Sequence, residues 1–190
     1  MVKVVGLLLC GGAARRFGAD KLMAGEPPVA VRAARNLLAG VKRVLAVVPL
    51  EHASLREALE AAGCEILETD RTARGMGASL AAAVEAAAGA DAWIVALGDM
   101  PAVNPDTIVA LRHALESGAR IAAPFDAGGR RGHPVGFAAD LRGELLALDG
   151  DVGARSLLER HAEVIERVVS DDAGIFVDID TPQDLAALRG

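Results

Sequence analysis

The chain has 190 residues, a formal net charge of −6 at pH 7 and a sequence pI near 5.2. This length suits one α/β domain over residues 1–190, and the acidic balance argues against nucleic-acid binding through bulk electrostatics, so any anion site must be local. Hydrophobic residues make up 52% of the sequence and aromatic residues only 3%, so leucine, valine and isoleucine must form most of the core.

Strand-like apolar runs recur along the whole chain. They cover residues 3–10, 42–48, 64–69, 92–99, 120–125, 163–169 and 175–179. Segments with helical periodicity separate most of them, an alternation typical of a mostly parallel sheet with helices on both faces. In such a sheet the loops that leave the carboxyl ends of the strands share one edge, where ligands bind. The sequence therefore predicts a three-layer, Rossmann-like α/β sandwich with its site at that edge.

The first of these loops, LLCGGAARRFGADK at residues 8–21, carries the strongest functional pattern. Gly11 and Gly12 break the strand so that backbone amides can face one space, and Arg16 and Lys21 add fixed charge around it. Amide donors surrounded by cations are what a polyphosphate requires. An ordinary turn with solvated arginines is the alternative, because the segment fits neither GxGxxG nor GxxxxGK[ST].

The glycine turn, Arg16, the pair Phe17-Gly18 and Lys21 resemble the signature loop of the nucleotidyltransferase superfamily, especially that of the molybdenum cofactor cytidylyltransferases and guanylyltransferases. The resemblance implies a fold like that of the nucleotide-diphospho-sugar transferases. It also implies that backbone amides of residues 11–14 and the catalytic Arg16 hold the β and γ phosphates, while catalytic Lys21 meets the α-phosphate. The nucleotide-binding residues expected here are Leu9, Cys10, Gly11, Gly12, Ala13, Ala14, Arg16 and Lys21.

Two helices are expected next, over residues 28–40 and 52–62. The first is marked by prolines at its start and by Gly40 at its end. Both are interpreted as scaffold, and His52 as a surface or capping residue.

The segment RTARGMGASL, residues 71–80, precedes an alanine-rich helix. Its glycines could simply shape the entry to that helix, with Ser79 in the first turn. The cytidylyltransferases have a similar segment, and the resemblance implies that Gly75, Gly77 and Ser79 form a wall of the base pocket.

Asp99 ends a buried apolar run in the motif LGDMP. Helix capping is the usual structural role of such a residue, but Asn104 before Pro105 is the better cap. A carboxylate beside a triphosphate would hold Mg²⁺, which binds through one or two carboxylates and phosphate oxygens. The motif also resembles the family's metal-binding aspartate motif, so Asp99 is the expected metal ligand and a catalytic residue.

The segment DAGGRRGHPVGF, residues 126–137, has the composition of a flexible surface hairpin. A lone histidine such as His133 is more often structural than a general base. The pattern RGHPV nevertheless resembles the segment that cytidylyltransferases place near the acceptor. The resemblance implies that His133 and Pro134, with Pro101 of the preceding motif, position the acceptor substrate.

Residues 149–157, DGDVGARSL, resemble a further family segment. Asp149 or Asp151 could cap the helix that follows. The resemblance implies that Arg155 meets the phosphate of the pterin acceptor.

The closing segment IFVDIDTPQDL contains a helix start at Asp180 or Thr181 before Pro182. It also matches the family's C-terminal motif, whose acidic residue joins the first aspartate at the metal. Asp178 and Asp180 would alternate along a strand and face opposite sides. Asp180, nearer the strand end, is the expected second metal ligand.

Taken together, the resemblance implies a Mg²⁺-dependent transfer of CMP from CTP to the phosphate of molybdenum-molybdopterin, with release of pyrophosphate. The molybdoenzyme that receives the cofactor, or its chaperone, is a further candidate partner. The alternatives are a guanylyltransferase with the same acceptor, a nucleotidyltransferase for another phosphorylated acceptor such as a sugar phosphate, and a non-catalytic nucleotide-binding module.

The nucleotide preference depends on Gly11, where the cytidylyl branch has alanine and the guanylyl branch glycine. A missing Cβ beside the base leaves room for a larger ring. Because one methyl group changes binding by only about 1–3 kcal/mol, the other segments should still favour CTP, with GTP used detectably.

The two cysteines, Cys10 and Cys64, lack metal-ligand spacing and lie in apolar runs, so buried free thiols in a reducing compartment are expected. No apolar run reaches about 18 residues, and no signal-peptide cleavage pattern follows Lys3. The sequence predicts a cytoplasmic protein that binds no membrane.

Overall fold

Seven strands form one sheet in the part of the chain that the computed structural model describes, residues 2–11 and 20–188. Their order is β3-β2-β1-β4-β6-β5-β7, and among them β6 runs antiparallel to its neighbours β4 and β5. The strands are β1 (Val4–Leu9), β2 (Val44–Val48), β3 (Glu65–Glu68), β4 (Ala92–Leu97), β5 (Ile121–Phe125), β6 (Val135–Ala138) and β7 (Ile165–Val169). The expected mostly parallel sheet is confirmed.

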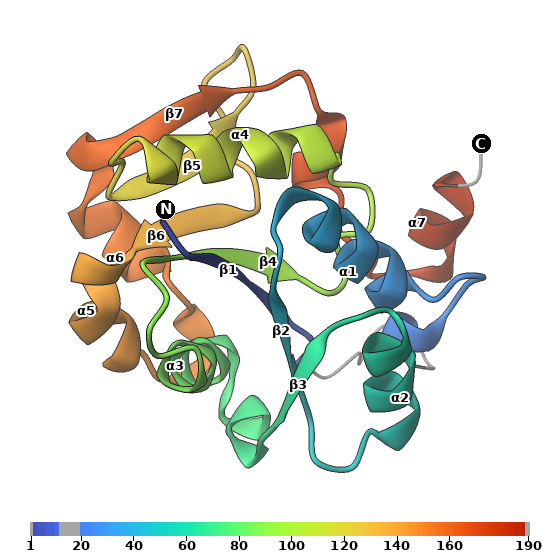
Figure 1. Cartoon of the computed structure of the whole chain (residues 1–190). Coiled ribbons are helices and arrows are strands. Elements are labelled where there is room, and N and C mark those ends of the chain that lie inside the picture. Colours follow the sequence, from blue (N-terminus) through green and yellow to red (C-terminus); the bar gives the residue numbers. More distant parts are fainter. Residues whose placement is uncertain (1, 12–19, 189–190) are drawn as a thin grey trace.

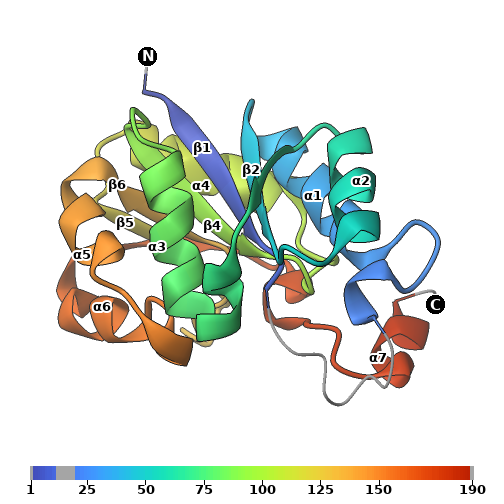
Figure 2. The same ribbon diagram turned by 90° about the horizontal axis from the view of Figure 1, so that it is seen from below.

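Helices cover both faces of this sheet, as Figures 1 and 2 show. One face carries α1 (Val29–Gly40), α2 (Ala53–Ala61) and α4 (Pro105–Glu116). The other carries α3 (Met76–Ala86), α5 (Arg142–Leu146) and α6 (Arg155–Arg160). The short helix α7 (Pro182–Ala187) lies beyond the carboxyl ends of the parallel strands. The 3₁₀ turns are η1 (Lys21–Met23), η2 (Asp70–Arg74), η3 (Ala139–Leu141), η4 (Gly150–Val152), η5 (Ala162–Val164) and η6 (Ala173–Phe176).

The central strand β1 is buried on both faces, which explains its unbroken apolar sequence. Val4 and Leu8 point into the core under α1, while Val5 and Leu7 point into the core under α3. This alternation follows from the two-residue period of a strand. Among the described residues no helix is long and apolar enough to cross a membrane.

One expected strand is absent, and one strand of the sheet was not predicted. Residues 175–179 do not form a strand, because Asp172 caps η6 by accepting from Gly174 N at 2.9 Å, and the chain then continues without sheet pairing to Asp180. The sheet also contains β6, which was not predicted; the turn expected at Gly128 and Gly129 is present and joins β5 to this antiparallel strand. A strand of four residues with a central glycine, Gly136, has too little apolar pattern to be recognised without its partners.

Cys10 and Cys64 are both buried free thiols under α1, as expected. Burial raises the pKa of Cys64 to about 11, and burial together with nearby Cys64 and Asp99 raises the pKa of Cys10. Since only the thiolate is nucleophilic, neither side chain should react in the folded protein.

We therefore expect no reaction with a disulfide reagent such as DTNB at pH 8, and two reacting thiols once guanidinium unfolds the chain. The measurement is the release of the coloured thiol from the reagent. A Cys64→Ala variant assigns any signal. A fast thiol that remains in this variant would contradict the burial of Cys10, which adjoins the candidate site.

Candidate active site

Asp99 lies beyond β4 at the edge of the sheet where β1 also ends. The ladder continues past both strands, because Gly98 N donates to Leu9 O at 2.9 Å. Helix α4 is capped elsewhere, since the Asn104 side chain accepts from Asp106 N at 2.9 Å. Asp99 thus has no capping duty, as the sequence indicated, and it faces the start of the glycine loop.

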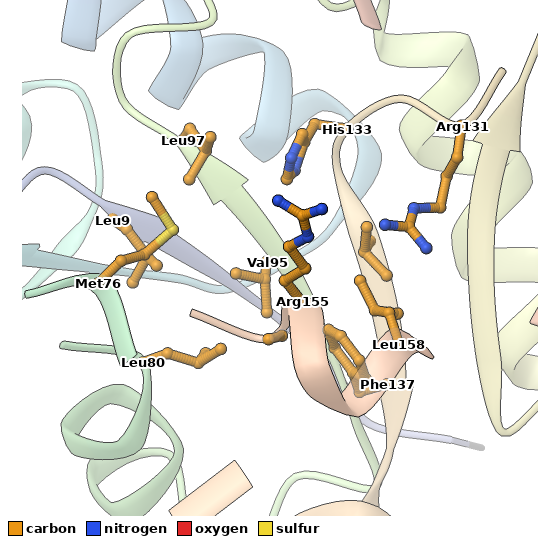
Figure 3. Close-up of a pocket in the computed structure, with 12 residues that line it drawn as sticks. Leu9, Met76, Leu80, Val95, Leu97, Arg131, His133, Phe137, Arg155 and Leu158 are labelled. Carbon is orange, nitrogen blue, oxygen red and sulfur yellow. The ribbon is translucent and has the colours of Figure 1, made fainter. Parts of the chain in front are cut away.

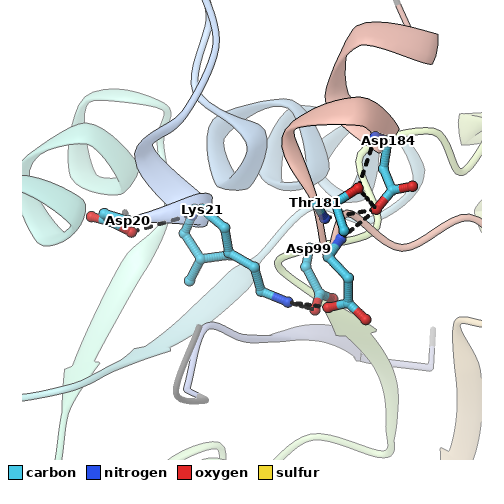
Figure 4. A network of polar contacts seen from close by, with 7 residues as sticks. Asp20, Lys21, Asp99, Thr181 and Asp184 are labelled. Atoms are coloured by element: carbon cyan, nitrogen blue, oxygen red, sulfur yellow. Dashed lines mark hydrogen bonds and ion pairs between the residues drawn. The ribbon is translucent and has the colours of Figure 1, made fainter. Parts of the chain in front are cut away.

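Lys21 joins Asp99 to Asp180 at this edge (Figure 4). Its Nζ atom lies 2.7 Å from Asp99 Oδ2 and 3.0 Å from Asp180 Oδ1. The side chains of Lys21, Asp99 and Asp180 are 14%, 24% and 45% exposed, so the cluster is half-buried and open on the Asp180 side. Three residues chosen from separate sequence motifs therefore meet at one point.

Hydrogen bonds of the backbone and of α7 bring Asp180 to this point. Ile179 N donates to Asp99 O at 2.8 Å, which fixes the C-terminal segment to the end of β4. Asp180 N donates to Asp184 Oδ2 at 3.0 Å, and Thr181 completes a capping box with Asp184. The predicted helix start at Pro182 is confirmed, with Thr181 as its cap.

The choice between Asp178 and Asp180 depended on strand alternation, which does not apply because this segment is not a strand. Asp178 is exposed, whereas Asp180 reaches Lys21. The geometry thus places the residue that the sequence favoured at the cluster, for a different physical reason.

Asp20 and His52 hold Lys21 in place, and the sequence did not indicate this. The Asp20 carboxylate caps η1 by accepting from Leu22 N at 3.2 Å, and its other oxygen lies 2.9 Å from His52 Nε2. His52 stands at the first position before α2 but makes no side-chain cap there. An aspartate directly before a short helical turn is a capping signal that could have identified Asp20. Its pairing with His52 depends on the tertiary fold.

The charge state of the cluster is set by its mutual contacts. Partial burial alone would lower the pKa of Lys21, but hydrogen bonds and ion pairs, first with Asp99 and then with Asp180, outweigh it and raise that pKa above its ordinary value. Lys21 is therefore an ammonium ion throughout the working range of pH.

A cavity of about 180 Å³ opens beside this cluster, on the side of the glycine loop. It is lined by Leu9, Gly11, Lys21, Leu22, Met76, Ser79, Leu97 and Asp99. The structure thus gathers four residues of the expected nucleotide site, from β1, η1 and α3, around one space. Cys10 is buried, so it can offer a ligand only its backbone.

Gly75, Gly77 and Ser79 lie where α3 begins. Close packing against residues 149–150 explains the two glycines, and a hydrogen bond within the helix occupies the Ser79 hydroxyl. Gly75 has φ +116°, and a Cβ added to Gly75 or Gly77 would collide with the backbone of residues 149–150. Buried Ser79 donates its hydroxyl to Gly75 O at 2.9 Å, so only its oxygen remains available to a ligand. This corresponds to the alternative in which the glycines shape the helix entry.

Asp149 and Asp151 do not cap α6, contrary to one expectation, because α6 begins after Ala154 without a side-chain cap. Asp149 instead pairs with Arg74 at 2.7 Å, which ties the η4 turn to the segment before α3.

A second cavity, of about 200 Å³, adjoins the first and shares Leu9, Met76 and Leu97 with it (Figure 3). Its remaining lining is apolar apart from Arg131, His133 and Arg155. Figure 3 shows the guanidinium groups of Arg131 and Arg155 reaching into this space from the segment before β6 and from the start of α6. The sequence missed Arg131, although it stands two residues before His133 and so shares its face in an extended segment.

His133 is a neutral group in this cavity wall. Burial, reinforced by Arg131, lowers its pKa, and its Nδ1 atom is buried without a hydrogen-bond partner among the described residues. Pro134 faces a separate space under α1, and Pro101 lines neither cavity, its carbonyl instead accepting from Asn36 Nδ2 at 3.0 Å. The structure thus brings His133 and Arg155 together, but not Pro101 and Pro134 with them.

Four residues expected to bind nucleotide, Gly12, Ala13, Ala14 and Arg16, lie in residues 12–19, outside the described part of the chain.

Comparison with protein-family profiles shows the family to which the chain belongs. The sequence profile of the MobA-like NTP transferase domain matches residues 6–164 of the chain. No match was found among curated proteins.

Solved structures match almost the whole chain. Rv0371c from Mycobacterium tuberculosis is 25% identical, with a TM-score of 0.83 over 98% of this chain and 97% of that chain. A second structure of Rv0371c, 23% identical with a TM-score of 0.78 over 98% of both chains, is a complex with manganese. A nucleotidyl transferase from Methanothermobacter thermautotroptrophicus is 22% identical, with a TM-score of 0.80 over 98% of this chain and 96% of that one.

A CMP:2-keto-3-deoxy-manno-octonic acid synthetase complexed with CTP is 16% identical, with a TM-score of 0.72 over 98% of this chain and 97% of that chain. The expected likeness to the fold of nucleotide-diphospho-sugar transferases is confirmed.

Proposed function

Because the chain belongs to the MobA-like NTP transferase family and is therefore a nucleotidyltransferase, we propose that it transfers CMP from CTP to the terminal phosphate of molybdenum-carrying molybdopterin. An oxygen of the acceptor phosphate attacks the α-phosphorus and forms a new P–O bond. The bond from the α-phosphorus to the oxygen that bridges to the β-phosphate breaks, and pyrophosphate leaves. No side-chain base is needed, because the attacking phosphate is already an anion.

One observation carries this proposal: the ammonium of Lys21 and the carboxylates of Asp99 and Asp180 converge at the wall of a cavity that adjoins a second one. A transferase needs two adjoining substrate spaces with charged groups between them, because the reacting atoms of both substrates must be held within bonding reach. In-line phosphoryl transfer is catalysed mainly by such positioned charges.

The carboxylates suit a magnesium ion. Oxygen ligands from one or two carboxylates, completed by phosphate oxygens, are the usual protein environment of Mg²⁺. Among the described residues no cluster of three or more His, Cys, Asp or Glu side chains could hold a metal. In this proposal phosphate oxygens of the nucleotide, with water, complete the coordination of the two carboxylates. The manganese complex of Rv0371c supports a divalent cation. Once bound, Mg²⁺ would neutralise charge on the phosphate oxygens.

In this proposal the cavity at Gly11 and Ser79 receives the nucleotide, and Lys21 contacts the α-phosphate. The cavity at His133 and Arg155 receives the acceptor. Its apolar lining suits a flat ring system, and Arg155 and Arg131 offer guanidinium donors to the acceptor phosphate. The bound CTP of the structurally similar octonic acid synthetase supports a cytidine nucleotide.

Pyrophosphate release tests the proposed function. The assay pairs CTP or GTP, with Mg²⁺, with molybdopterin, a sugar phosphate or no acceptor. Release that requires both CTP and molybdopterin supports the proposal. Strong preference for GTP indicates a guanylyltransferase, release with a sugar phosphate indicates another acceptor, and no release with any pair indicates a binding module.

A Gly11→Ala variant should increase the preference for CTP over GTP by about tenfold, measured as the ratio of the two kcat/KM values. An added Cβ would lie 3.1 Å from the Thr72 side chain and 3.4 Å from Ser79 Oγ. The methyl group therefore narrows the nucleotide cavity on the Ser79 side, and Thr72 must give way by a few tenths of an ångström.

Thr72→Ser, which removes one of the two crowded Thr72 atoms, is the control in the Gly11→Ala background. It should restore part of the stability lost to crowding while leaving the sharper nucleotide preference. Equal loss of both kcat/KM values in Gly11→Ala would mean that the glycine serves loop packing and not base selection.

A further inference from the structure

Lys21 occupies the space that a metal ion shared by Asp99 and Asp180 would need. Its Nζ atom donates to one oxygen of each carboxylate, at 2.7 and 3.0 Å. Mg²⁺ lies about 2.0–2.1 Å from its oxygen ligands. An ammonium ion and a divalent cation cannot both lie between the same two oxygens, because they would overlap and repel each other.

The two carboxylates need a cation in this arrangement. The hydrogen bond from Ile179 N to Asp99 O holds them near each other, and neighbouring like charges are unfavourable unless neutralised. Within residues 2–11 and 20–188, Lys21 is the cation that pairs with either of them. The ammonium therefore stabilises the closed arrangement of the β4 end and the C-terminal segment.

The ammonium of Lys21 can move while the backbone of Lys21 stays in place. Its backbone is fixed by the Asp20 cap and, through Asp20, by His52, whereas four methylene groups separate the charge from that anchor. Rotation within the side chain is enough to move the charge from the carboxylates to the adjoining nucleotide cavity, which Lys21 also lines.

We propose that Lys21 is the resident counter-ion of the Asp99–Asp180 pair, and that a divalent cation gains these carboxylates only when the ammonium moves to a phosphate of the incoming nucleotide. This inference rests on the proposed function for the identity of that anion. Metal and nucleotide then favour each other's binding, and the coupling is reciprocal. The lysine offsets one of the two negative charges between turnovers and makes the site selective for a metal that arrives with nucleotide.

Mn²⁺ binding in the absence of nucleotide tests this inference, with electron paramagnetic resonance reporting the free ion. Lys21→Met should bind Mn²⁺ about tenfold more tightly than the wild type, since the metal no longer has to break charge-assisted hydrogen bonds. Lys21→Arg should behave like the wild type because it keeps the charge. Lys42→Met, which removes an exposed lysine, is the matched control and should not change affinity.

A second change identifies the place of binding. Asp180→Asn in the Lys21→Met background should abolish the gain, and Mn²⁺ should raise the melting temperature of Lys21→Met more than that of the wild type. If methionine prevents folding, Lys21→Gln provides the same neutral test with a hydrogen-bond donor retained.

Equal Mn²⁺ affinity in the wild type and Lys21→Met, or a gain that survives Asp180→Asn, overturns the inference. The outcome is separate from that of the proposed function, because no nucleotide, acceptor or turnover enters the measurement. A protein that releases no pyrophosphate with any substrate pair could still show the tighter metal binding.

Discussion

Asp99→Ala is expected to abolish pyrophosphate release while the protein stays folded. Loss of one positioned group that stabilises developing charge lowers kcat by about 100- to 1,000-fold in comparable sites, and the Asp99 side chain also positions Lys21. The fold should survive, because Lys21 keeps Asp180 as a partner and a whole domain is stable by about 5–15 kcal/mol. The measurements are steady-state kinetics at saturating Mg²⁺ and a thermal melt.

Asp178→Ala is the matched control for Asp99→Ala. Asp178 is an exposed carboxylate in the C-terminal segment that carries Asp180. Its removal changes the charge of the protein by the same amount as Asp99→Ala, without removing a partner of Lys21. It should leave kcat nearly unchanged. Near-normal turnover of Asp99→Ala would rule out its role as a metal ligand.

Lys21→Ala is expected to lower kcat by about 100-fold and to change the KM for the nucleotide much less. A cation directed at charge that develops on the α-phosphate acts mainly in the transition state, whereas one that grips only the ground-state phosphates changes KM. The anchored position of Lys21 beside Asp99 places its charge at the wall of the proposed nucleotide cavity, where we expect that charge to develop.

Lys42→Ala serves as the control for this prediction, because Lys42 is exposed and lies outside both cavities. A change confined to KM in Lys21→Ala would make Lys21 a binding residue only. Removal of the Lys21 charge is thus expected to lower kcat but to raise the affinity for a metal in the absence of nucleotide. Because the two expected effects have opposite signs, measuring both separates the catalytic role of Lys21 from its role as counter-ion.

The sequence indicated the general fold because its strongest signals are local. Buried strands such as β1 are continuous apolar runs, and alternation with helices predicts parallel pairing. Helix caps could also be predicted from the sequence. Asn104 before Pro105 and Thr181 before Pro182 cap the starts of helices in the structure, as expected. These features depend on hydrogen bonds between residues only a few positions apart.

The candidate site was predictable in its parts but not in its assembly. Asp99 could be selected because no helix needed it as a cap, and Lys21 because it closes the glycine loop. Their contact with Asp180 depends on the backbone hydrogen bond from Ile179 to Asp99, between segments far apart in sequence, and on the cap of α7 that orients Asp180. The roles of these residues in catalysis remain predictions that the variants above will test.

The sequence by itself determined the layered α/β architecture, the positions of most helix starts and the motifs that gather at one sheet edge, because periodicity and capping are properties of neighbouring residues. Only the tertiary structure decided that β6 enters the sheet between β4 and β5, that residues 175–179 stay out of it, and that Lys21 stands between two carboxylates. The physical reason is that strand pairing and ion pairing depend on which partners the rest of the fold leaves free, and no local pattern records those partners.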